Sequence, residues 1–293
     1  MNASLFAATL QGDDMTSSST AVKPSPFVKW AGGKRQLSEA IKKRMPTEFN
    51  RYYEPFVGGG ALYLELVPNG AVINDINSAL MSAYRYIKDE PENLMSKLDA
   101  LDSGLSDDPK PYYYQIRSLF NERLLAKEYG IDTAAMLIFI NKHCFNGLYR
   151  VNSKGAYNVP CNGSKRKSYS FDNIMAVSRS LASATILNED FETACSDAEA
   201  GDFVFFDSPY APNNPQSFES YTKEGFAKEE HERLAALFRK LTDRGCYCIL
   251  TNHNTKFINE LYSGFQIDVV QVKRMINSDA SKRNGTEVII KNF

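Results

Sequence analysis

The sequence has few of the side chains that build metal sites and disulfides. Its five cysteines are odd in number and scattered, and no two of them have the CxxC spacing of a zinc site. None of its three histidines has a second histidine or a cysteine at ligand spacing. We therefore expect a reduced, cytosolic protein without a bound metal. Cys246 and Cys248 stand two apart in an apolar run, so strand periodicity predicts that both thiols are buried on one face.

The sequence also lacks an excess of one charge and any long apolar run. Its 34 Lys and Arg residues oppose 35 Asp and Glu residues, which excludes a polybasic arm or an acidic disordered tail as its main character. No uninterrupted apolar run approaches the ~20 residues of a membrane span, and the first residues do not resemble a secretory signal. What is present is a chain of 293 residues, 43% hydrophobic, enough for one large or two smaller globular domains.

The pattern along the chain predicts an open α/β sheet. Residues 1–25 are rich in Ser, Thr, Ala and Asp, and we expect a disordered tail there. Beyond them, short β-rich runs alternate with amphipathic stretches, as in α/β proteins. The expected strands are 52–57, 71–74, 184–188, 203–206 and 246–250, and the expected helices are 34–45, 79–88, 172–182 and 227–241.

Residues 89–170 interrupt this alternation and are predicted to form an insertion between two parts of one domain, residues 26–88 and 171–293. The insertion has helical periodicity to about residue 143, then a segment rich in Gly, Asn and Ser. Between residues 141 and 170 there are six Lys and Arg residues, interleaved with tyrosines, and no Asp or Glu. This composition indicates a surface that follows phosphates. The alternative is a solvated loop whose acidic partners lie elsewhere.

A glycine run, residues 58–60, falls where an expected strand ends and a helix begins. There it forms either a ligand loop or an ordinary tight turn. It is no dinucleotide fingerprint, because the third glycine position holds Tyr63, and no GK[ST] follows to make a phosphate loop. Asp75 ends the next expected strand, where a carboxylate commonly holds ribose hydroxyls. Together these features favour a nucleoside-type cofactor.

A second acidic turn, Asp207-Ser208-Pro209-Tyr210, follows the apolar run 203–206. It places a carboxylate, backbone carbonyls and an aromatic face at the end of a strand. Hydrogen bonds from the two amino hydrogens of adenine to such acceptors make the amino nitrogen a better nucleophile. An aromatic ring can stack on a base that has left the duplex. The alternative is a structural turn capped by the aspartate.

Seven motifs occur in one order, and together they resemble the DNA adenine methyltransferase (Dam) family. They are FVKWAGGK (27–34), EPFVGGG (54–60), NDIN (74–77), NKHCFNGLYR (141–150), NVP (158–160), DSPY (207–210) and TNH (251–253). The family transfers methyl from S-adenosylmethionine to N6 of adenine in GATC, and the resemblance runs from about residue 27 to the C-terminus. It implies a Rossmann-like open sheet with an inserted helical and β-hairpin DNA-recognition domain. It also implies a duplex DNA substrate, base flipping, and the cytoplasm of a bacterial or phage-infected cell.

The resemblance assigns site residues by position. The cofactor contacts it implies are Trp30, Lys34, Phe56, Gly58, Gly60, Asp75 and Asp207. The catalytic residues it implies are Asp207, Pro209 and Tyr210. For DNA it implies guanine contacts by Lys29 and Arg150, a wedge beside the target pair at Leu148, and supporting contacts by Asn146 and Pro160.

One departure from the family concerns Ser208, since the family usually has proline at this position. Serine loosens the turn but keeps the backbone acceptors, so we expect an active enzyme. Two other functions remain open: a DNA-binding protein silenced at Ser208, and methylation of an RNA adenine or a protein glutamine. Nothing in the sequence demands more than a monomer. We expect His143 to be either a phosphate contact or a packed side chain, and His231 to be a surface or packing residue. His253 follows an expected strand and is expected to form part of a pocket wall.

Overall fold

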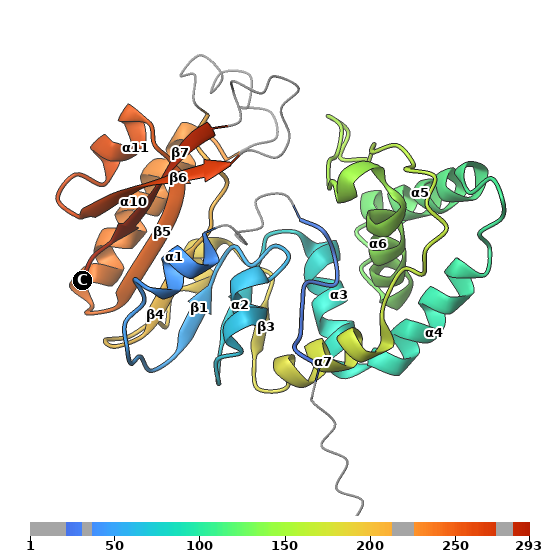
Figure 1. The fold of residues 1–293 in the computed structure, drawn as a ribbon, viewed down its shortest axis with the longest axis horizontal. Helices are drawn as coiled ribbons and strands as arrows, with labels where there is room; N and C mark the ends of the chain where they lie inside the picture. The colour runs from blue at the N-terminus through green and yellow to red at the C-terminus, as the bar shows by residue number, and fades with distance from the viewer. Residues whose placement is uncertain (1–21, 31–36, 213–225, 274–283) are drawn as a thin grey trace, which may run out of the picture.

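The computed structural model describes residues 22–30, 37–212, 226–273 and 284–293. Its seven-stranded sheet has the order β3-β2-β1-β4-β5-β7-β6 (Figure 1). Strands β1 to β5 pair in parallel, whereas β7 runs antiparallel to both β5 and β6. The expected α/β class is confirmed. The strands are β1 (Tyr52–Glu54), β2 (Val72–Asn74), β3 (Thr185–Leu187), β4 (Phe203–Phe206), β5 (Tyr247–His253), β6 (Gln266–Lys273) and β7 (Asn284–Lys291).

The helices begin where the sequence supplies local signals. The side chain of Asn77 accepts a hydrogen bond from the Leu80 amide at 3.0 Å and so caps α3, and Pro91 occupies the first turn of α4. The helices are α1 (Ser38–Lys42), α2 (Ala61–Leu66), α3 (Ser78–Asp89), α4 (Pro91–Asp102), α5 (Lys110–Leu125), α6 (Ile131–His143), α7 (Phe171–Leu181), α8 (Phe191–Ala194), α10 (Lys228–Asp243) and α11 (Lys256–Leu261).

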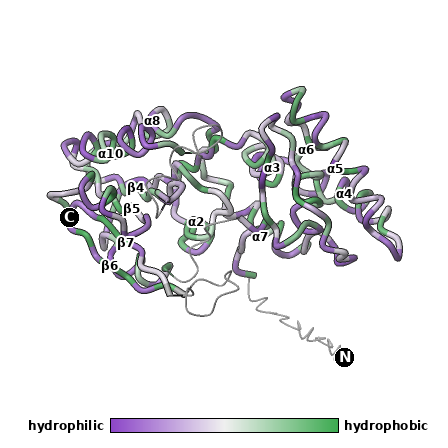
Figure 2. The backbone as a smooth tube through the Cα atoms, turned by 90° about the horizontal axis from the view of Figure 1, so that it is seen from above, coloured by the Kyte–Doolittle hydropathy of each residue, from purple (hydrophilic) through white to green (hydrophobic). Residues whose placement is uncertain are grey.

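Strand β4 shows why the sheet is covered on both faces. All four of its side chains are buried, and alternate residues point to opposite faces. Phe203 and Phe205 join the core cluster that includes residues of α1, α2 and α3, whereas Val204 and Phe206 join the cluster that includes residues of α10. Figure 2 shows α8 and α10 together on one side of β4 and β5.

The order of strands reverses between β1 and β4, which lie side by side in parallel. In open α/β sheets such a reversal opens a crevice at the carboxyl ends of the two strands, and ligands bind there. The glycine run follows β1, and the turn that begins at Asp207 follows β4. The fold therefore brings the two most informative motifs of the sequence to one edge of the sheet.

The helices α4, α5 and α6 pack on one another beside the sheet, next to α3 (Figure 1). They come from the segment expected to be an insertion. A short 3-10 helix (Phe145–Gly147) and two isolated antiparallel bridges, Cys144 to Cys161 and Val151 to Tyr157, follow α6. The structure thus has a helical group and a hairpin-like segment between α3 and α7.

The described residues confirm every expected strand, and the ends are shifted in all of them except β4. β1 is shorter than expected because the chain turns at Pro55, and β5 continues to His253 because it pairs with β7. The expected helix 34–45 is described only from residue 37 and is helical at 38–42. Cys246 and Cys248 are buried, as predicted. Residues 1–21 of the expected tail lie outside the described residues, whereas Ser25 exchanges backbone hydrogen bonds with the Asn173 side chain.

Candidate active site

The glycine run forms a tight turn in which side chains would not fit. Gly58 and Gly60 have φ values of +49° and +68°, which disfavour other residues. A Cβ at Gly60 would lie 2.5 Å from the Tyr84 hydroxyl oxygen, and that hydroxyl donates a hydrogen bond to the Gly58 carbonyl at 3.0 Å. The turn therefore brings backbone rather than side chains to the end of β1.

Asp75 lies beside this turn, at the end of β2. One carboxylate oxygen accepts from the Gly58 amide at 3.1 Å, and the other from the Asn77 amide at 2.9 Å. Burial raises the pKa of Asp75, and these two amides oppose the shift. Each oxygen keeps a lone pair for a further donor, which suits a pair of ribose hydroxyls.

Two aromatic residues of the expected cofactor set flank the glycine turn. The Trp30 ring lies so close that a Cβ at Gly58 would be 2.8 Å from it, and the ring also stacks on Tyr149 at 5.0 Å. Phe56 packs against Phe191 and Phe226. Of the two remaining expected contacts, Lys34 lies outside the described residues and Asp207 follows β4. The donors, acceptors and rings present fit a nucleoside cofactor of the expected kind.

The acidic turn after β4 is held by consecutive residues of β5. The Thr251 hydroxyl donates to the Asp207 carboxylate at 3.0 Å. The Asn252 side-chain oxygen accepts from the Ala211 amide at 2.9 Å, and His253 Nδ1 lies 2.8 Å from the Ala211 carbonyl. A carbonyl only accepts, so Nδ1 carries the hydrogen. The TNH motif thus fixes the position of the turn that the sequence analysis singled out.

The Tyr210 side chain is half-buried and lies at the end of the same turn, after the exposed Pro209. Its hydroxyl donates to Glu287 at 2.8 Å, and its ring meets the His253 ring at 4.8 Å in a near-perpendicular arrangement. Burial and the carboxylates of Asp207 and Glu287 raise the pKa of Tyr210, so its hydroxyl stays protonated. His253 thus contacts both Tyr210 and the Ala211 carbonyl, and its predicted place in a pocket wall stays a prediction. Glu287 is not among the residues predicted from the sequence, because the strand that carries it, β7, was not predicted either.

Glu54 is a second carboxyl group at this edge of the sheet. It is fully buried at the end of β1 and accepts a hydrogen bond from the Tyr52 hydroxyl at 2.7 Å. Burial, with a contribution from the Asp207 charge, raises the pKa of Glu54 to about 8. At neutral pH Glu54 is therefore mainly protonated and does not compete with Asp207 as the negative charge of the site.

The expected DNA-contact residues gather around the hairpin-like segment. Lys29, Asn146, Arg150 and Pro160 are exposed and Leu148 is half-buried. The buried Asn141 side chain accepts from the Lys29 amide at 2.8 Å and donates to the Lys29 and Gly147 carbonyls at 2.9 and 3.1 Å. This single amide fastens the segment that carries Lys29 to the hairpin that carries Arg150.

Part of the basic segment, residues 141–170, has acidic partners. Lys165 pairs with Asp107 at 2.9 Å, and Lys167 pairs with Asp99 at 3.1 Å. The exposed basic residues without an ion pair among the described residues are Lys142, Arg150, Lys154 and Arg166. The interpretation as a loop with acidic partners elsewhere therefore holds for Lys165 and Lys167, whereas the phosphate surface stays a prediction for the other four residues.

His143 is no phosphate contact, because its side chain is fully buried. Its Nδ1 lies 2.9 Å from the Ser164 carbonyl and its Nε2 lies 3.2 Å from the Ser168 hydroxyl, which in turn donates to Asp102. These bonds hold the basic segment against α4. His231 is also buried and packs against Phe226, as expected for a packing residue.

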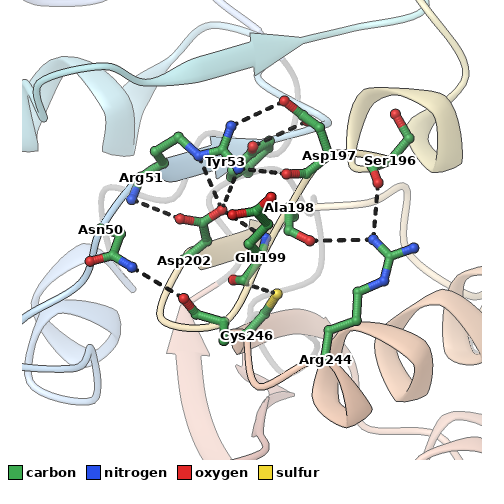
Figure 3. Close-up of polar contacts among 11 residues, drawn as sticks. Asn50, Arg51, Tyr53, Ser196, Asp197, Ala198, Glu199, Asp202, Arg244 and Cys246 are labelled. Carbon is green, nitrogen blue, oxygen red and sulfur yellow. Dashed lines mark hydrogen bonds and ion pairs between the residues drawn. The ribbon is translucent and has the colours of Figure 1, made fainter.

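A charged cluster at the opposite edge of the sheet is a structural feature (Figure 3). Arg51 lies 2.9 Å from the Asp202 carboxylate and 3.0 Å from Asp197, beside a shallow hollow lined mainly by residues 196–200. Asp202 precedes β4 whereas Asp207 follows it, so the cluster lies at the far end of that strand. Arg51 pairs with both aspartates, which fixes the starts of β1 and β4.

Two further kinds of feature are absent from the described residues. No group of three or more His, Cys, Asp and Glu side chains there could hold a metal ion. None of the helices in the described ranges is both long and apolar enough to cross a membrane.

Comparison with known proteins agrees with this geometry. Residues 30–276 match the family described as D12 class N6 adenine-specific DNA methyltransferase. The Type II methyltransferase M1.LlaDCHI of Lactococcus lactis subsp. cremoris is 40% identical over 273 residues, which cover 92% of this chain and 95% of that protein. The Type II methyltransferase M.MjaIII of Methanocaldococcus jannaschii is 41% identical over 286 residues, with coverage of 92% and 99%. The DNA adenine methylase of Haemophilus influenzae is 30% identical over 274 residues, with coverage of 93% and 94%.

The family match spans most of the chain, and these relatives are similar to it over nearly their whole lengths. The chain therefore belongs to the D12 class of N6 adenine-specific DNA methyltransferases, enzymes that take the methyl group from S-adenosylmethionine.

Proposed function

We propose that this enzyme methylates adenine within GATC in duplex DNA, and that the reaction takes place between the glycine turn after β1 and the acidic turn after β4. The observation that carries the site is the position of these turns on neighbouring parallel strands where the strand order reverses. The GATC sequence itself is supported by the motifs that resemble the Dam family.

The cofactor is held at the glycine turn. Asp75 accepts the ribose hydroxyls, and the backbone at Gly58 and Gly60 allows close approach. Trp30 and Phe56 supply apolar contact, and Lys34 belongs to the same site by its motif. When bound, the sulfonium supplies an activated methyl group.

The target adenine leaves the duplex and enters the space beside the acidic turn, where its ring stacks on Tyr210. The Asp207 carboxylate accepts one amino hydrogen, and a backbone carbonyl of the turn before Pro209 accepts the other. With the cofactor bound, its methyl group would pass to N6 while the electron pair of the carbon–sulfur bond stays on sulfur, and the proton that N6 loses would pass to solvent. Thr251 aligns Asp207 for this role through the 3.0 Å hydrogen bond.

DNA recognition belongs to the hairpin-like segment and to Lys29. Arg150 and Lys29 can each donate to guanine O6 and N7, and a bidentate arginine contact discriminates by ~1–3 kcal/mol. Leu148 lies beside the target pair, and Asn146 and Pro160 support it. Residues 26–88 and 171–293 form the catalytic domain, and residues 89–170 form the target-recognition insertion. The enzyme acts as a monomer, in the cytoplasm of a bacterial or phage-infected cell.

Transfer of labelled methyl to matched duplexes tests this function. The duplexes differ only by GATC or GTTC, and each is assayed at equal enzyme and cofactor concentration. We expect label on the GATC duplex alone. Label on both duplexes would contradict the GATC assignment, and binding of DNA and cofactor without any label would indicate a silent DNA-binding homologue.

A further inference from the structure

Glu287 contacts the proposed stacking ring from a strand that the sequence motifs do not include. Its carboxylate accepts the Tyr210 hydroxyl hydrogen at 2.8 Å. Glu287 lies on β7 directly opposite His253 of β5, so the two side chains share one face of the sheet. The three residues that follow Glu287, Val288, Ile289 and Ile290, are fully buried, which fixes this part of β7 in the core.

The chain is fixed directly after Tyr210, so the orientation of the Tyr210 ring depends on contacts of the ring itself. The backbone of the next residue, Ala211, is held from both its amide and its carbonyl by Asn252 and His253. A tyrosine ring turns about two side-chain torsions. The His253 ring restricts it from one direction at 4.8 Å, and the bond to Glu287 fixes its far end.

We propose that Glu287 is a positioning residue, which sets the plane of the Tyr210 ring so that the extruded adenine stacks with its amino group at Asp207. This inference rests on the proposed function. Glu287 acts through the tyrosine hydroxyl and contacts neither the base nor the cofactor. A bond from a hydroxyl to a carboxylate is among the stronger hydrogen bonds, and it is formed before the base arrives.

Four variants separate this role from a general effect on folding. Glu287→Ala removes the acceptor, and Glu287→Gln keeps an acceptor oxygen of similar shape. Tyr210→Phe removes the donor but keeps the ring, and the double variant Glu287→Ala with Tyr210→Phe tests whether the two changes act together. The matched control is Asp197→Ala, because Asp197 accepts the Tyr53 hydroxyl hydrogen at 3.1 Å at the far edge of the sheet.

The first measurement is the single-turnover rate of methyl transfer at saturating DNA and cofactor. We expect Glu287→Ala and Tyr210→Phe each to slow transfer by about tenfold, since a misplaced base lowers the rate of the chemical step more than the affinity for DNA. The KM for DNA should stay near that of the parent. The double variant should be no slower than either single variant, and Glu287→Gln and Asp197→Ala should keep most of the parent rate.

The second measurement is the fluorescence of 2-aminopurine in place of the target adenine. An extruded base is bright when unstacked and quenched when it stacks on an aromatic ring. We expect the complexes of Glu287→Ala and Tyr210→Phe to be about twofold brighter than the parent complex. A purely structural role of Glu287 would leave this signal unchanged.

The outcomes distinguish this inference from the proposed function. If Tyr210→Ala transfers methyl at the parent rate, the proposed stacking site is wrong. If Tyr210→Ala is inactive while Glu287→Ala matches the parent in rate and fluorescence, the site stands and the role of Glu287 is refuted. Additive losses in the double variant would also refute it.

Discussion

At the scale of single residues, Glu54 links the site to the stability of the fold. Its pKa of about 8 in the folded protein exceeds the ordinary value of 4.5 because the side chain is buried. Between these two values the folded chain holds a proton that the unfolded chain releases. The stability is therefore full below about pH 4.5 and falls as the pH rises toward 8, by about 1.4 kcal/mol for each pH unit.

Replacement of Glu54 by glutamine should remove this pH dependence. Glutamine mimics the neutral acid and cannot ionise, so Glu54→Gln should gain stability over the parent as the pH rises from 5 to 8. Urea unfolding at pH 5, 6.5 and 8 measures the difference between the two proteins. Glu229→Gln, at an exposed position in the first turn of α10, is the control. A difference that stays constant across these pH values would contradict the burial of an ionisable Glu54.

Ser208 lies in the acidic turn, and its hydroxyl is buried without a hydrogen-bond partner among the described residues. An unpartnered buried hydroxyl is unfavourable, so Ser208→Ala should raise the free energy of unfolding by about 1 kcal/mol. Neither Ser208→Ala nor Ser208→Pro removes a backbone acceptor of the turn, and both should turn over at least as fast as the parent. A tenfold slower Ser208→Pro enzyme would show that the serine has a role of its own.

At the scale of elements, the contact between Lys29 and the hairpin joins two segments that are far apart in the sequence. Asn141 bonds to both, and Gly147 has φ +66°. A Cβ at Gly147 would collide with the Lys29 side chain. Glycine is required here for its backbone angle and also for its lack of a side chain. The hairpin and Lys29 are therefore positioned together, as the proposed guanine contacts of Lys29 and Arg150 require.

Substitution of Gly147 should disturb this arrangement, and the same hairpin offers a matched control. Gly155 has a similar φ of +75°, but a Cβ added there would meet no atom of the described residues within 4 Å. Both Gly147→Ala and Gly155→Ala introduce backbone strain, but only the first displaces Lys29. We expect Gly147→Ala to weaken DNA binding by about tenfold, measured by fluorescence anisotropy. Equal losses in the two variants would contradict the docking of Lys29 on the hairpin.

The sequence predicts the parallel part of the sheet better than its antiparallel part. The run 203–206 is apolar throughout and bounded by Asp202 and Asp207, so β4 is found with its observed ends. β6 is not predicted. It is a half-exposed strand at the edge of the sheet, and its mixed polar and apolar residues give a weak strand pattern. β7 follows residues outside the described part, and its pairing with β5 depends on contacts distant in sequence.

The sequence predicts the site residues that belong to motifs, and it misses a residue that reaches the site from a strand without a motif. Asp75 and the glycine turn stand in neighbouring motifs, and the parallel sheet brings them together. Glu287 has no motif around it that marks it, because its role comes only from the register of β7 beside β5. The burial of His143 was not predicted, because no neighbouring residue in the sequence indicates that Asp102 and Ser168 lie against its ring.

At the scale of the whole molecule, a net charge of −1 conceals a local excess of positive charge. The acidic partners of the basic segment, Asp99 and Asp107, come from α4 and the loop after it. They neutralise Lys165 and Lys167 and leave other basic side chains for the phosphates. DNA affinity should therefore depend on salt through a subset of the lysines and arginines.

Two lysine variants test this division. Lys154→Gln removes an exposed charge without an ion pair among the described residues, whereas Lys167→Gln removes a charge already paired with Asp99. We expect Lys154→Gln to reduce the slope of log affinity against log salt by about 0.9, and Lys167→Gln to change it much less. Titration of one GATC duplex at several salt concentrations measures both slopes. A larger change for Lys167→Gln would contradict this division of the basic segment.

In the proposed function the carboxylate of Asp207, at the end of β4, promotes methyl transfer to the adenine amino group. Single-turnover transfer to a GATC duplex by the parent and by Asp207→Ala tests it, with DNA binding measured for both proteins. We predict a rate lower by roughly 10³-fold or more for the variant at saturating cofactor, with DNA affinity changed only a few-fold, since the lost interaction acts mainly in the transition state. A variant that transfers methyl at the parent rate would contradict this role of Asp207.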